Sequence, residues 1–257
     1  MNENLDIFIC AHKKFETQVF DDSYKILSVG KNIELYGDGI IRDDNGINCS
    51  EINNFYSELS GYYWVWKNYL IKDYIGFCHY RRYFDFMDNI PNMDEIFEEY
   101  DIILPSKENF GCLIYNQYKQ CHNIDDLNEI MDIVKEKDIS VDVLLSDNSM
   151  YCFNMFIMKR ELFYEYCEFV FGICQEYLRR HNIQNMEDIK NMMDENKDKY
   201  YKGSYPSNDF RYQCRIGGFL AERLLNIWIR HKKLKVKEYN VITTENKYKE
   251  KKANDFV

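Results

Sequence analysis

Glycine and proline are scarce in this sequence of 257 residues, which contains 11 Gly and 3 Pro. Neither of the two glycine-rich phosphate-binding motifs, Gly-x-Gly-x-x-Gly and Gly-x-x-x-x-Gly-Lys-Ser/Thr, occurs, and the Gly-x-Ser-x-Gly elbow of serine hydrolases is also missing. These absences argue against a dinucleotide oxidoreductase, a P-loop nucleotide triphosphatase and a serine hydrolase. A bound phosphate would have to be neutralised by side chains or by a metal ion.

Long apolar runs are absent as well. No stretch reaches the roughly 20 apolar residues of a membrane-spanning helix, and the first residues lack the pattern of a signal peptide. The 9 Cys occur singly without a Cys-x-x-Cys, which is typical of small core residues in a reducing compartment. Cys112, Cys121 and His122 are too sparse to indicate a zinc site. We therefore expect a cytoplasmic protein.

Positive charge is in deficit, since the net charge is -10. Nucleic-acid binding requires a basic face, so a nucleic-acid partner is not expected. The segment 233–257 is nevertheless a basic tail. Two interpretations remain open for it: a solvated tail, or a peripheral contact with the anionic inner face of a membrane, to which each charge would contribute about 1 kcal/mol.

Aromatic and apolar residues are abundant, at 16% and 46% of the chain, and their periodicity predicts the fold. Short apolar runs predict strands and amphipathic stretches predict helices, and the two alternate over the first two-thirds of the chain. This pattern favours a single α/β domain, 1–257, with a mainly parallel central sheet flanked by helices and a helical C-terminal part. The predicted strands are 5–11, 24–29, 74–78, 101–105, 151–158 and, weakly, 236–242; the predicted helices are 50–70, 93–99, 125–137, 161–180 and 219–231. The polar segment 181–208 is expected to be a lid or an insertion.

The stretch 73–84 is the strongest candidate for a functional site. An apolar strand ends there in His79-Tyr-Arg-Arg82, and open α/β sheets bind ligands at the carboxyl ends of their strands. Adjacent arginines cannot both point one way on a strand, so at least one must leave the ladder. Arg matches phosphate oxygens with a fixed fork of donors. The alternative is a solvated turn with two surface arginines.

Three further features can contribute to a ligand site. His12 follows the first predicted strand and would join the same edge of the sheet, unless it is a surface histidine. Asn154 interrupts the apolar run 151–158, where a buried amide needs hydrogen-bond partners from the backbone or from a ligand. The aromatic surplus of the predicted helix 50–70 is explained by core packing, with a stacking platform for a sugar or base as the second interpretation.

Five blocks follow one another along the sequence. They are Glu58-Leu-Ser-Gly-Tyr-Tyr-Trp-Val-Trp-Lys-Asn68, Gly76-Phe-Cys-His-Tyr-Arg-Arg-Tyr83, Gln117-Tyr with His122, Asn154-Met-Phe-Ile-Met158 and Arg215-Ile-Gly-Gly-Phe-Leu-Ala-Glu-Arg-Leu-Leu225. In this order they resemble a bacterial polysaccharide-biosynthesis family long known only as a domain of unknown function in capsule and exopolysaccharide clusters. Its members are regarded as glycosyltransferases, some of them galactofuranosyltransferases. The resemblance extends from about residue 5 to residue 230.

A more distant resemblance, to GT-A glycosyltransferases, implies a GT-A-like fold and roles for two blocks. In those enzymes a buried strand ends in Asp-x-Asp, which holds a metal ion on the nucleotide diphosphate. Here His79-Tyr-Arg81 stands at the corresponding place, so Arg81 and Arg82 would neutralise the diphosphate. Phe153-Asn154 resembles a later turn near the sugars. Metal dependence stays open, because Mg or Mn could be recruited by Asp43, Asp44 or Asp38.

The acceptor hydroxyl of an inverting transfer must lose its proton to a carboxylate or a histidine. The candidates are Glu222, Asp209 and His122, which the sequence does not rank. Glu222 beside Arg223 is equally well explained as a helical ion pair. Arg215 is a candidate for a second phosphate clamp.

We therefore expect a glycosyltransferase that moves a hexose, perhaps galactose as furanose or pyranose, in surface polysaccharide synthesis. The donor would be a nucleotide-diphosphate sugar, UDP-linked in the first instance, and the acceptor a glycan or a lipid-linked sugar. The expected donor-binding residues are His12, His79, Arg81, Arg82, Asn154 and Arg215. The alternative is a non-catalytic nucleotide-sugar or carbohydrate-binding module in a polysaccharide assembly complex.

Overall fold

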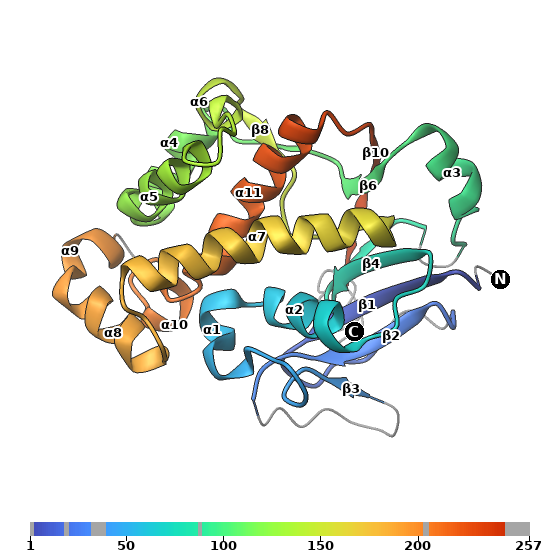
Figure 1. Cartoon of the computed structure of the whole chain (residues 1–257), viewed down its shortest axis with the longest axis horizontal. Helices are drawn as coiled ribbons and strands as arrows, with labels where there is room; N and C mark the ends of the chain where they lie inside the picture. Colours follow the sequence, from blue (N-terminus) through green and yellow to red (C-terminus); the bar gives the residue numbers. More distant parts are fainter. Residues whose placement is uncertain (1–2, 18–20, 32–39, 87–88, 203–205, 245–257) are drawn as a thin grey trace, which may run out of the picture.

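A computed structural model describes residues 3–17, 21–31, 40–86, 89–202 and 206–244. Its central sheet, several strands of which are labelled in Figure 1, has the order β10-β6-β9-β4-β1-β2-β3; β5 pairs with β4, and β11 pairs with β5. The strands are β1 Leu5–Ala11, β2 Tyr24–Ser28, β3 Ile41–Arg42, β4 Tyr74–His79, β5 Arg82–Phe84, β6 Ile102–Pro105, β9 Phe156–Lys159, β10 Val236–Tyr239 and β11 Val241–Thr243. A separate pair is formed by β7 Glu108–Asn109 and β8 Ser149–Met150.

Parallel pairing dominates the centre of the sheet. The pairs β1 with β2, β1 with β4, β2 with β3 and β10 with β6 are parallel, whereas β9 runs antiparallel to both β4 and β6. Every residue of β1 is buried, as expected for a strand that is covered on both faces. The predicted mainly parallel sheet, flanked by helices and followed by a helical C-terminal part, is confirmed.

Alternation along β1 separates two hydrophobic clusters. Phe8 and Cys10 belong to the larger cluster, which includes side chains of α2, α7 and α11. Ile7 and Ile9 face the smaller one, which is closed by β5 and α3.

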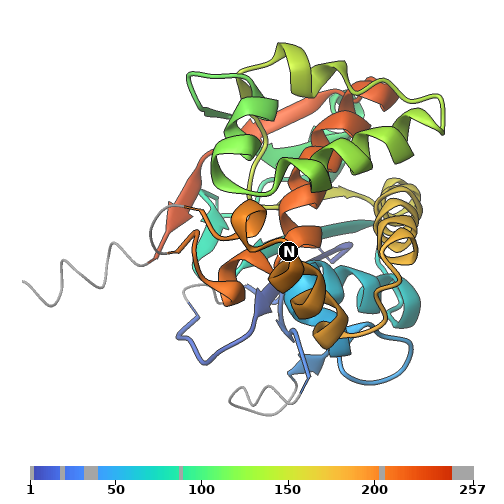
Figure 2. The same ribbon diagram turned by 90° about the vertical axis from the view of Figure 1, so that its left-hand side faces the viewer.

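Figures 1 and 2 show the long helix α7 beside the sheet. The helices are α1 Asn53–Tyr56, α2 Leu59–Asn68, α3 Met93–Glu99, α4 Ile114–Cys121, α5 Ile124–Lys135, α6 Asp142–Ser146, α7 Arg160–Arg180, α8 Met186–Glu195, α9 Lys197–Tyr200, α10 Phe210–Gln213 and α11 Ile216–Lys232, with a 3-10 turn at Ser50–Ile52.

The predicted single helix 50–70 is wrong, because the chain breaks between α1 and α2. Ser57 has a φ of 55°, which no helix accommodates. Ser50, the first residue of the predicted helix, begins a 3-10 turn instead. Leu70, the last residue of the predicted helix, is 92% exposed.

The apolar run 151–158 is a strand only from Phe156. Phe153 and Asn154 have φ values of 74° and 52°, so they form a left-handed turn that ends in β9. Asn154 therefore lies before the strand and not inside it. The aperiodic segment 106–124 also contains an unpredicted helix, α4.

The last strong helix begins earlier than predicted, so that Gly217 and Gly218 lie inside its first turn. The weak strand prediction at 236–242 corresponds to two strands. One of them, β11, pairs with β5, so part of the predicted basic tail belongs to the sheet. The rest of that tail, 245–257, lies outside the described residues.

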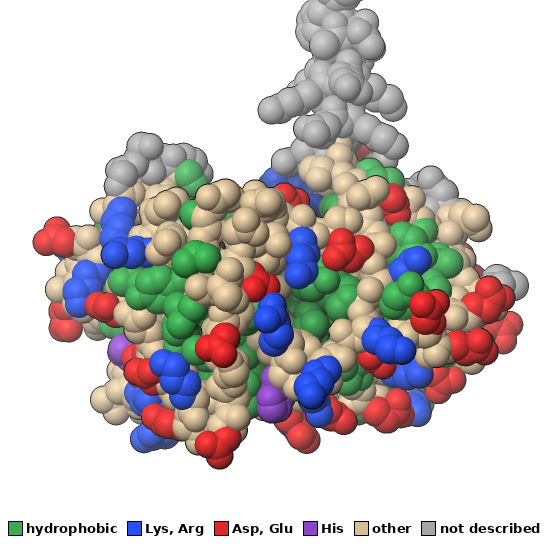
Figure 3. Space-filling view, turned by 90° about the horizontal axis from the view of Figure 1, so that it is seen from above, with side chains coloured by type: hydrophobic (Ala, Val, Ile, Leu, Met, Phe, Trp, Pro, Cys, Tyr) green, Lys and Arg blue, Asp and Glu red, His purple; other side chains and the backbone are tan. Residues whose placement is uncertain are grey.

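The polar segment 181–208 contains α8 and α9, and its Ile189 and Met193 are fully buried. A lid function for this segment stays a prediction. No described helix combines the length and the apolar character needed to cross a membrane. On the face that Figure 3 shows, acidic and basic side chains are interspersed, so that face carries no basic stripe.

Candidate functional site

A pocket of about 600 Å³ opens at the carboxyl ends of β1 and β4. Cys10 pairs with His79 in the parallel register, so the two strands end at the same edge of the sheet. His12 follows β1 there, and the segment 79–82 follows β4. The turn 153–154, α1, α10 and the first turns of α11 complete the wall. This is the position at which open α/β sheets bind ligands.

A tight hairpin sets the directions of the two adjacent arginines. His79 pairs with Arg82 in the antiparallel β4–β5 ladder, which leaves Tyr80 and Arg81 as the two-residue turn. Arg81 has therefore left the ladder, whereas Arg82 begins β5. The C-terminal strand supports the hairpin, because the backbone N–H of Thr244 donates to the Arg81 carbonyl at 3.0 Å.

Arginine dominates the charged lining of the pocket. The acidic lining residues are Glu58 and Glu222, and the arginines are Arg81, Arg82, Arg211, Arg215 and Arg223. In a chain of net charge -10, this concentration gives the pocket a local excess of positive charge.

Aromatic rings orient several of these guanidinium groups. The distances from guanidinium carbon to ring centroid are 4.9 Å for Arg81 over Tyr80, 4.6 Å for Arg82 over Phe153 and 5.4 Å for Arg215 over Phe219. A ring holds a cation without neutralising it. Among the described residues, no carboxylate pairs with Arg82 or Arg215, so both charges face the pocket.

The N-terminus of α11 adds a second source of positive potential. Arg215 is its N-cap residue, no side chain caps the helix, and its first turn contains no acidic residue. Gly218 and Phe219 of this turn line the pocket. Uncapped N–H groups and the helix dipole both favour an anion at this end.

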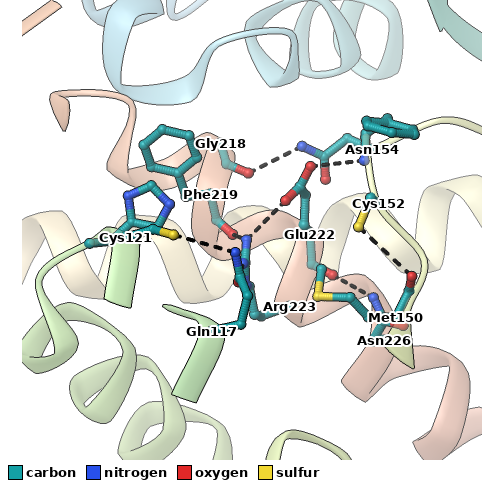
Figure 4. Close-up of polar contacts among 12 residues, drawn as sticks. Gln117, Cys121, Met150, Cys152, Asn154, Gly218, Phe219, Glu222, Arg223 and Asn226 are labelled. Atoms are coloured by element: carbon teal, nitrogen blue, oxygen red, sulfur yellow. Dashed lines mark hydrogen bonds and ion pairs between the residues drawn. The ribbon is translucent and has the colours of Figure 1, made fainter. Parts of the chain in front are cut away.

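The left-handed turn at 153–154 is fixed from several sides. The N–H of Phe153 donates to Glu222 at 2.8 Å, and the Phe153 carbonyl lies 2.7 Å from Nε2 of His79. The Asn154 amide nitrogen donates to Glu58 at 2.6 Å. It also donates to the Gly218 carbonyl at 3.1 Å, a contact that Figure 4 shows. These contacts connect β4, α11 and the N-terminus of α2 to one turn.

Glu222 is held by Arg223 as well as by the turn. Its second oxygen lies 2.9 Å from Nη1 of Arg223, whose side chain is 3% exposed against 20% for Glu222. Arg223 also donates to the Phe219 carbonyl at 2.9 Å and to Oε1 of Gln117 on α4 (Figure 4). The predicted ion pair is therefore present, and its carboxylate lines the pocket.

The other two candidate bases differ in their surroundings. His122 stacks on Phe219 with ring centroids 3.9 Å apart, and its Nδ1 lies 3.1 Å from Oε1 of Gln213. Burial and the charge of Arg223 lower the pKa of His122 to about 3, so its imidazole is neutral. Asp209 does not line the pocket; it caps α10 by accepting from the Arg211 N–H at 2.7 Å.

His12 lies at the rim, edge-on to Tyr80 with ring centroids 5.3 Å apart. Burial lowers its pKa, and the nearby charges of Lys13, Arg215 and Arg81 lower it further. Burial is the main cause of this lowered pKa, and the positive charges of the pocket act in the same direction.

Asp43 and Asp44, two of the carboxylates predicted to recruit a metal ion, have other partners. Asp43 is fully buried and accepts from the Gly30 N–H and from the Ser60 hydroxyl, and burial raises its pKa to about 6. Asp44 pairs with Arg42, and Asp38 lies outside the described residues. No group of three or more His, Cys, Asp or Glu suited to a metal occurs in the described part of the chain. Since the two pocket glutamates hold Asn154 and Arg223, the described side chains do not fit a protein-held Mg or Mn ion.

The structure brings most of the predicted residues together in this one pocket. They are His12, His79, Arg81, Arg82, His122, Asn154, Arg215 and Glu222; Asp209 is the exception. The candidate site residues did not include Arg211, Gln117 or Glu58, although the last two belong to the resembling sequence blocks. The spacing of Arg211, Arg215 and Arg223 by four and eight residues was the available signal for a shared side of the pocket.

Comparisons with known proteins give a family and a similar solved structure. A family described as a domain of unknown function, DUF4422, matches residues 6–194. A solved apo structure of WbbM, a bifunctional glycosyltransferase, is 27% identical over 93% of this chain with a TM-score of 0.71. The match covers 45% of the WbbM chain, so this chain spans less than half of that protein. No curated protein matches the sequence.

Proposed function

Because this chain belongs to the DUF4422 domain family and carries an arginine-lined pocket, we propose that it is a glycosyltransferase. It would move a hexose, with galactose as furanose or pyranose the first to test, from a nucleotide-diphosphate sugar to a glycan or lipid-linked acceptor in surface polysaccharide synthesis. The similarity to a bifunctional glycosyltransferase supports this proposal.

The arginines and the N-terminus of α11 are the observation that carries the proposal. A nucleotide sugar presents a diphosphate, and the diphosphate gains negative charge as it leaves. Guanidinium forks and uncapped N–H groups stabilise such charge best where water is displaced. Arg82 and Arg215 would provide this stabilisation from opposite parts of the fold, β5 and the cap of α11.

The side of the pocket around Asn154 would hold the sugar and the acceptor. Asn154 offers an amide to a sugar hydroxyl, and Glu222 is the candidate base with the best position. Glu222 lines the pocket and is partly exposed, so it can receive the acceptor proton, whereas His122 is nearly enclosed and has a strongly lowered pKa.

The proposal is tested with a panel of nucleotide sugars and their nucleoside diphosphates, UDP and UDP-galactose first. Binding is measured by calorimetry, and hydrolysis or transfer is followed by product release. Arg82→Ala and Arg215→Ala should each weaken nucleoside diphosphate binding by about 10- to 100-fold, as expected for the loss of a charge-assisted hydrogen bond. Arg179→Ala is the control, because Arg179 is 71% exposed and pairs with Glu176.

Two results contradict the proposal. If no member of the panel is bound, hydrolysed or transferred at millimolar concentration, the pocket does not serve a nucleotide sugar. If a donor binds but is never turned over with any acceptor, and Glu222→Gln changes nothing, the chain is a non-catalytic nucleotide-sugar binding module.

A further inference from the structure

Asn154 is held in the pocket through both its backbone and its side-chain amide. The residue is 1% exposed, and its backbone is held in the left-handed region with a φ of 52°. Its carbonyl accepts a hydrogen bond from the Tyr62 hydroxyl, and its amide nitrogen donates to Glu58 and to Gly218. Backbone and side chain are thus fixed by residues of α2, its N-cap and α11.

The chemistry of these partners permits one orientation of the amide. The nitrogen faces two acceptors, a Glu58 carboxylate oxygen at 2.6 Å and the Gly218 carbonyl oxygen at 3.1 Å. If the amide were flipped, its oxygen would face both of those oxygens, and no donor would lie between them. Glu58 and the Gly218 carbonyl therefore hold the amide with its nitrogen toward α11 and its Oδ1 on the opposite side. Figure 4 shows the nitrogen directed at Gly218.

The opposite end of the amide has no partner. Oδ1 of Asn154 is buried and has no hydrogen-bond partner among the described residues, although the side chain lines the pocket. An acceptor without a partner in a buried position is costly unless a ligand supplies a donor. The group that satisfies Oδ1 must be a hydroxyl or an N–H.

We propose that Glu58 is a positioning residue that orients the Asn154 amide so that the site selects a ligand hydroxyl as hydrogen-bond donor to Oδ1. This inference rests on the proposed function, in which a nucleotide sugar occupies the pocket. It assigns a direction to one contact: the sugar donates and the protein accepts. A sugar position that can only accept would be rejected there.

Exchanging the carboxylate and the amide between positions 58 and 154 tests the inference. Asn154→Asp places two carboxylates against each other and should weaken nucleotide-sugar binding by about 10- to 100-fold. The double variant Glu58→Gln with Asn154→Asp restores a donor at position 58 and keeps an oxygen toward the ligand. The aspartate still faces the Gly218 carbonyl, so part of the loss, at least about threefold, should return. The nucleoside diphosphate lacks the transferred sugar, so it should bind the double variant, which conserves the net charge of the pocket, within about threefold of the wild type.

The ligands are the nucleoside diphosphate and nucleotide sugar that bind the wild type in the panel, UDP and UDP-galactose first. If neither binds the wild type, the proposed function fails. If both bind but the single and double variants weaken them equally, Glu58 is structural and the inference fails. Far-ultraviolet circular dichroism and thermal melting verify that each variant is folded.

A second measurement changes the ligand and leaves Glu58 in place. Replacing sugar hydroxyls one at a time by fluorine retains an acceptor and removes the donor. One of these deoxyfluoro nucleotide sugars should bind about 10- to 100-fold more weakly than its parent, and Asn154→Ala should abolish that difference. Equal affinity for the parent and every fluorinated analogue would overturn the proposal.

Discussion

Glu222 accepts a hydrogen bond of 2.8 Å from the backbone N–H of Phe153, a residue 69 positions earlier in the chain. This bond joins α11 to the left-handed turn in front of β9. The same carboxylate pairs with the buried Arg223, which reaches across to α4 through Gln117. One side chain thus connects the wall of the pocket to the turn that carries Asn154.

This connection predicts different effects for two substitutions of Glu222. Glu222→Gln keeps an acceptor for Phe153 but cannot take up a proton, so kcat should fall at least 100-fold, a typical contribution of a general base. Glu222→Ala should in addition lower the free energy of unfolding by about 1–3 kcal/mol, because a buried guanidinium and an N–H lose their partner. Steady-state kinetics and urea unfolding measure the two effects.

Glu168→Gln is the control for both measurements, since Glu168 is exposed on α7. Wild-type turnover in Glu222→Gln would remove Glu222 from the chemistry. It would leave Glu222 as a structural partner of Arg223.

Substitution by alanine should have opposite effects on stability at two glycines, Gly217, where α11 contacts α1, and Gly172 in α7. A Cβ at Gly217 would lie 2.6 Å from a ring carbon of Phe55, whereas a Cβ at Gly172 meets nothing within 4 Å. Gly217→Ala should therefore destabilise the protein by about 1–3 kcal/mol. Gly172→Ala, in the interior of α7, should stabilise it by about 0.5–1 kcal/mol. Thermal and urea unfolding measure the stability of each variant relative to the wild type. A Gly217→Ala variant as stable as the wild type would show that α1 can move away from α11.

Strands and long helices were predictable because their periodicity depends on burial that the sequence encodes directly. The buried run of β4 and the apolar face of α7 are examples, and Met93–Glu99 was predicted with its observed bounds. The position of the pocket followed from His79-Tyr-Arg-Arg82, since polar residues directly after a buried strand mark the edge of the sheet that binds ligands.

The backbone exceptions were not predictable. Ser57 and Asn154 adopt positive φ values without being glycine, and they do so because distant segments hold them: α11 packs against Ser57, and Glu58 binds Asn154. Contacts of this kind override local propensity. The role of Glu58 was invisible for the same reason, because its partner lies 96 residues away.

A buried carboxyl group predicts a pH dependence of stability. Asp126 accepts hydrogen bonds of 2.8 Å from the hydroxyls of Tyr177 on α7 and Tyr200 on α9. Burial raises its pKa to about 7, the two hydrogen bonds opposing the shift. Between about pH 4 and pH 7, Asp126 is therefore protonated in the folded state and ionised in the unfolded state, whose pKa is about 3.9. Stability from this group is complete at pH 4 and below and declines as the pH rises through about 7.

Asp126→Asn tests this dependence, since the amide keeps an oxygen for both tyrosines and does not titrate. The stability of the variant relative to the wild type should increase by about 1–3 kcal/mol between about pH 5 and about pH 8. Urea unfolding at both pH values measures the difference, in which other titrating groups such as Asp43 cancel. A constant difference would mean that Asp126 stays charged in the folded protein.

Chelation should leave nucleoside diphosphate binding nearly unchanged. The pocket neutralises charge with Arg82, Arg215 and the N-terminus of α11, while its two glutamates are occupied by Asn154 and Arg223. Arginine remains charged at every working pH and matches phosphate oxygens with its fork of donors. Affinity in EDTA should therefore remain within about threefold of the affinity with Mg²⁺ or Mn²⁺, a difference below 1 kcal/mol.

The Arg82→Ala, Arg215→Ala double variant sets the scale for this comparison, because it removes two of the proposed charges and should lose at least about 100-fold in affinity. Increasing salt should weaken nucleoside diphosphate binding by the wild type more than binding by the double variant, because the double variant has fewer charges to be screened. A loss above about tenfold on chelation that Mn²⁺ restores would contradict the prediction. In that case the cation would be held by the phosphates themselves or by carboxylates beyond the described residues, and the arginines would assist a metal instead of replacing it.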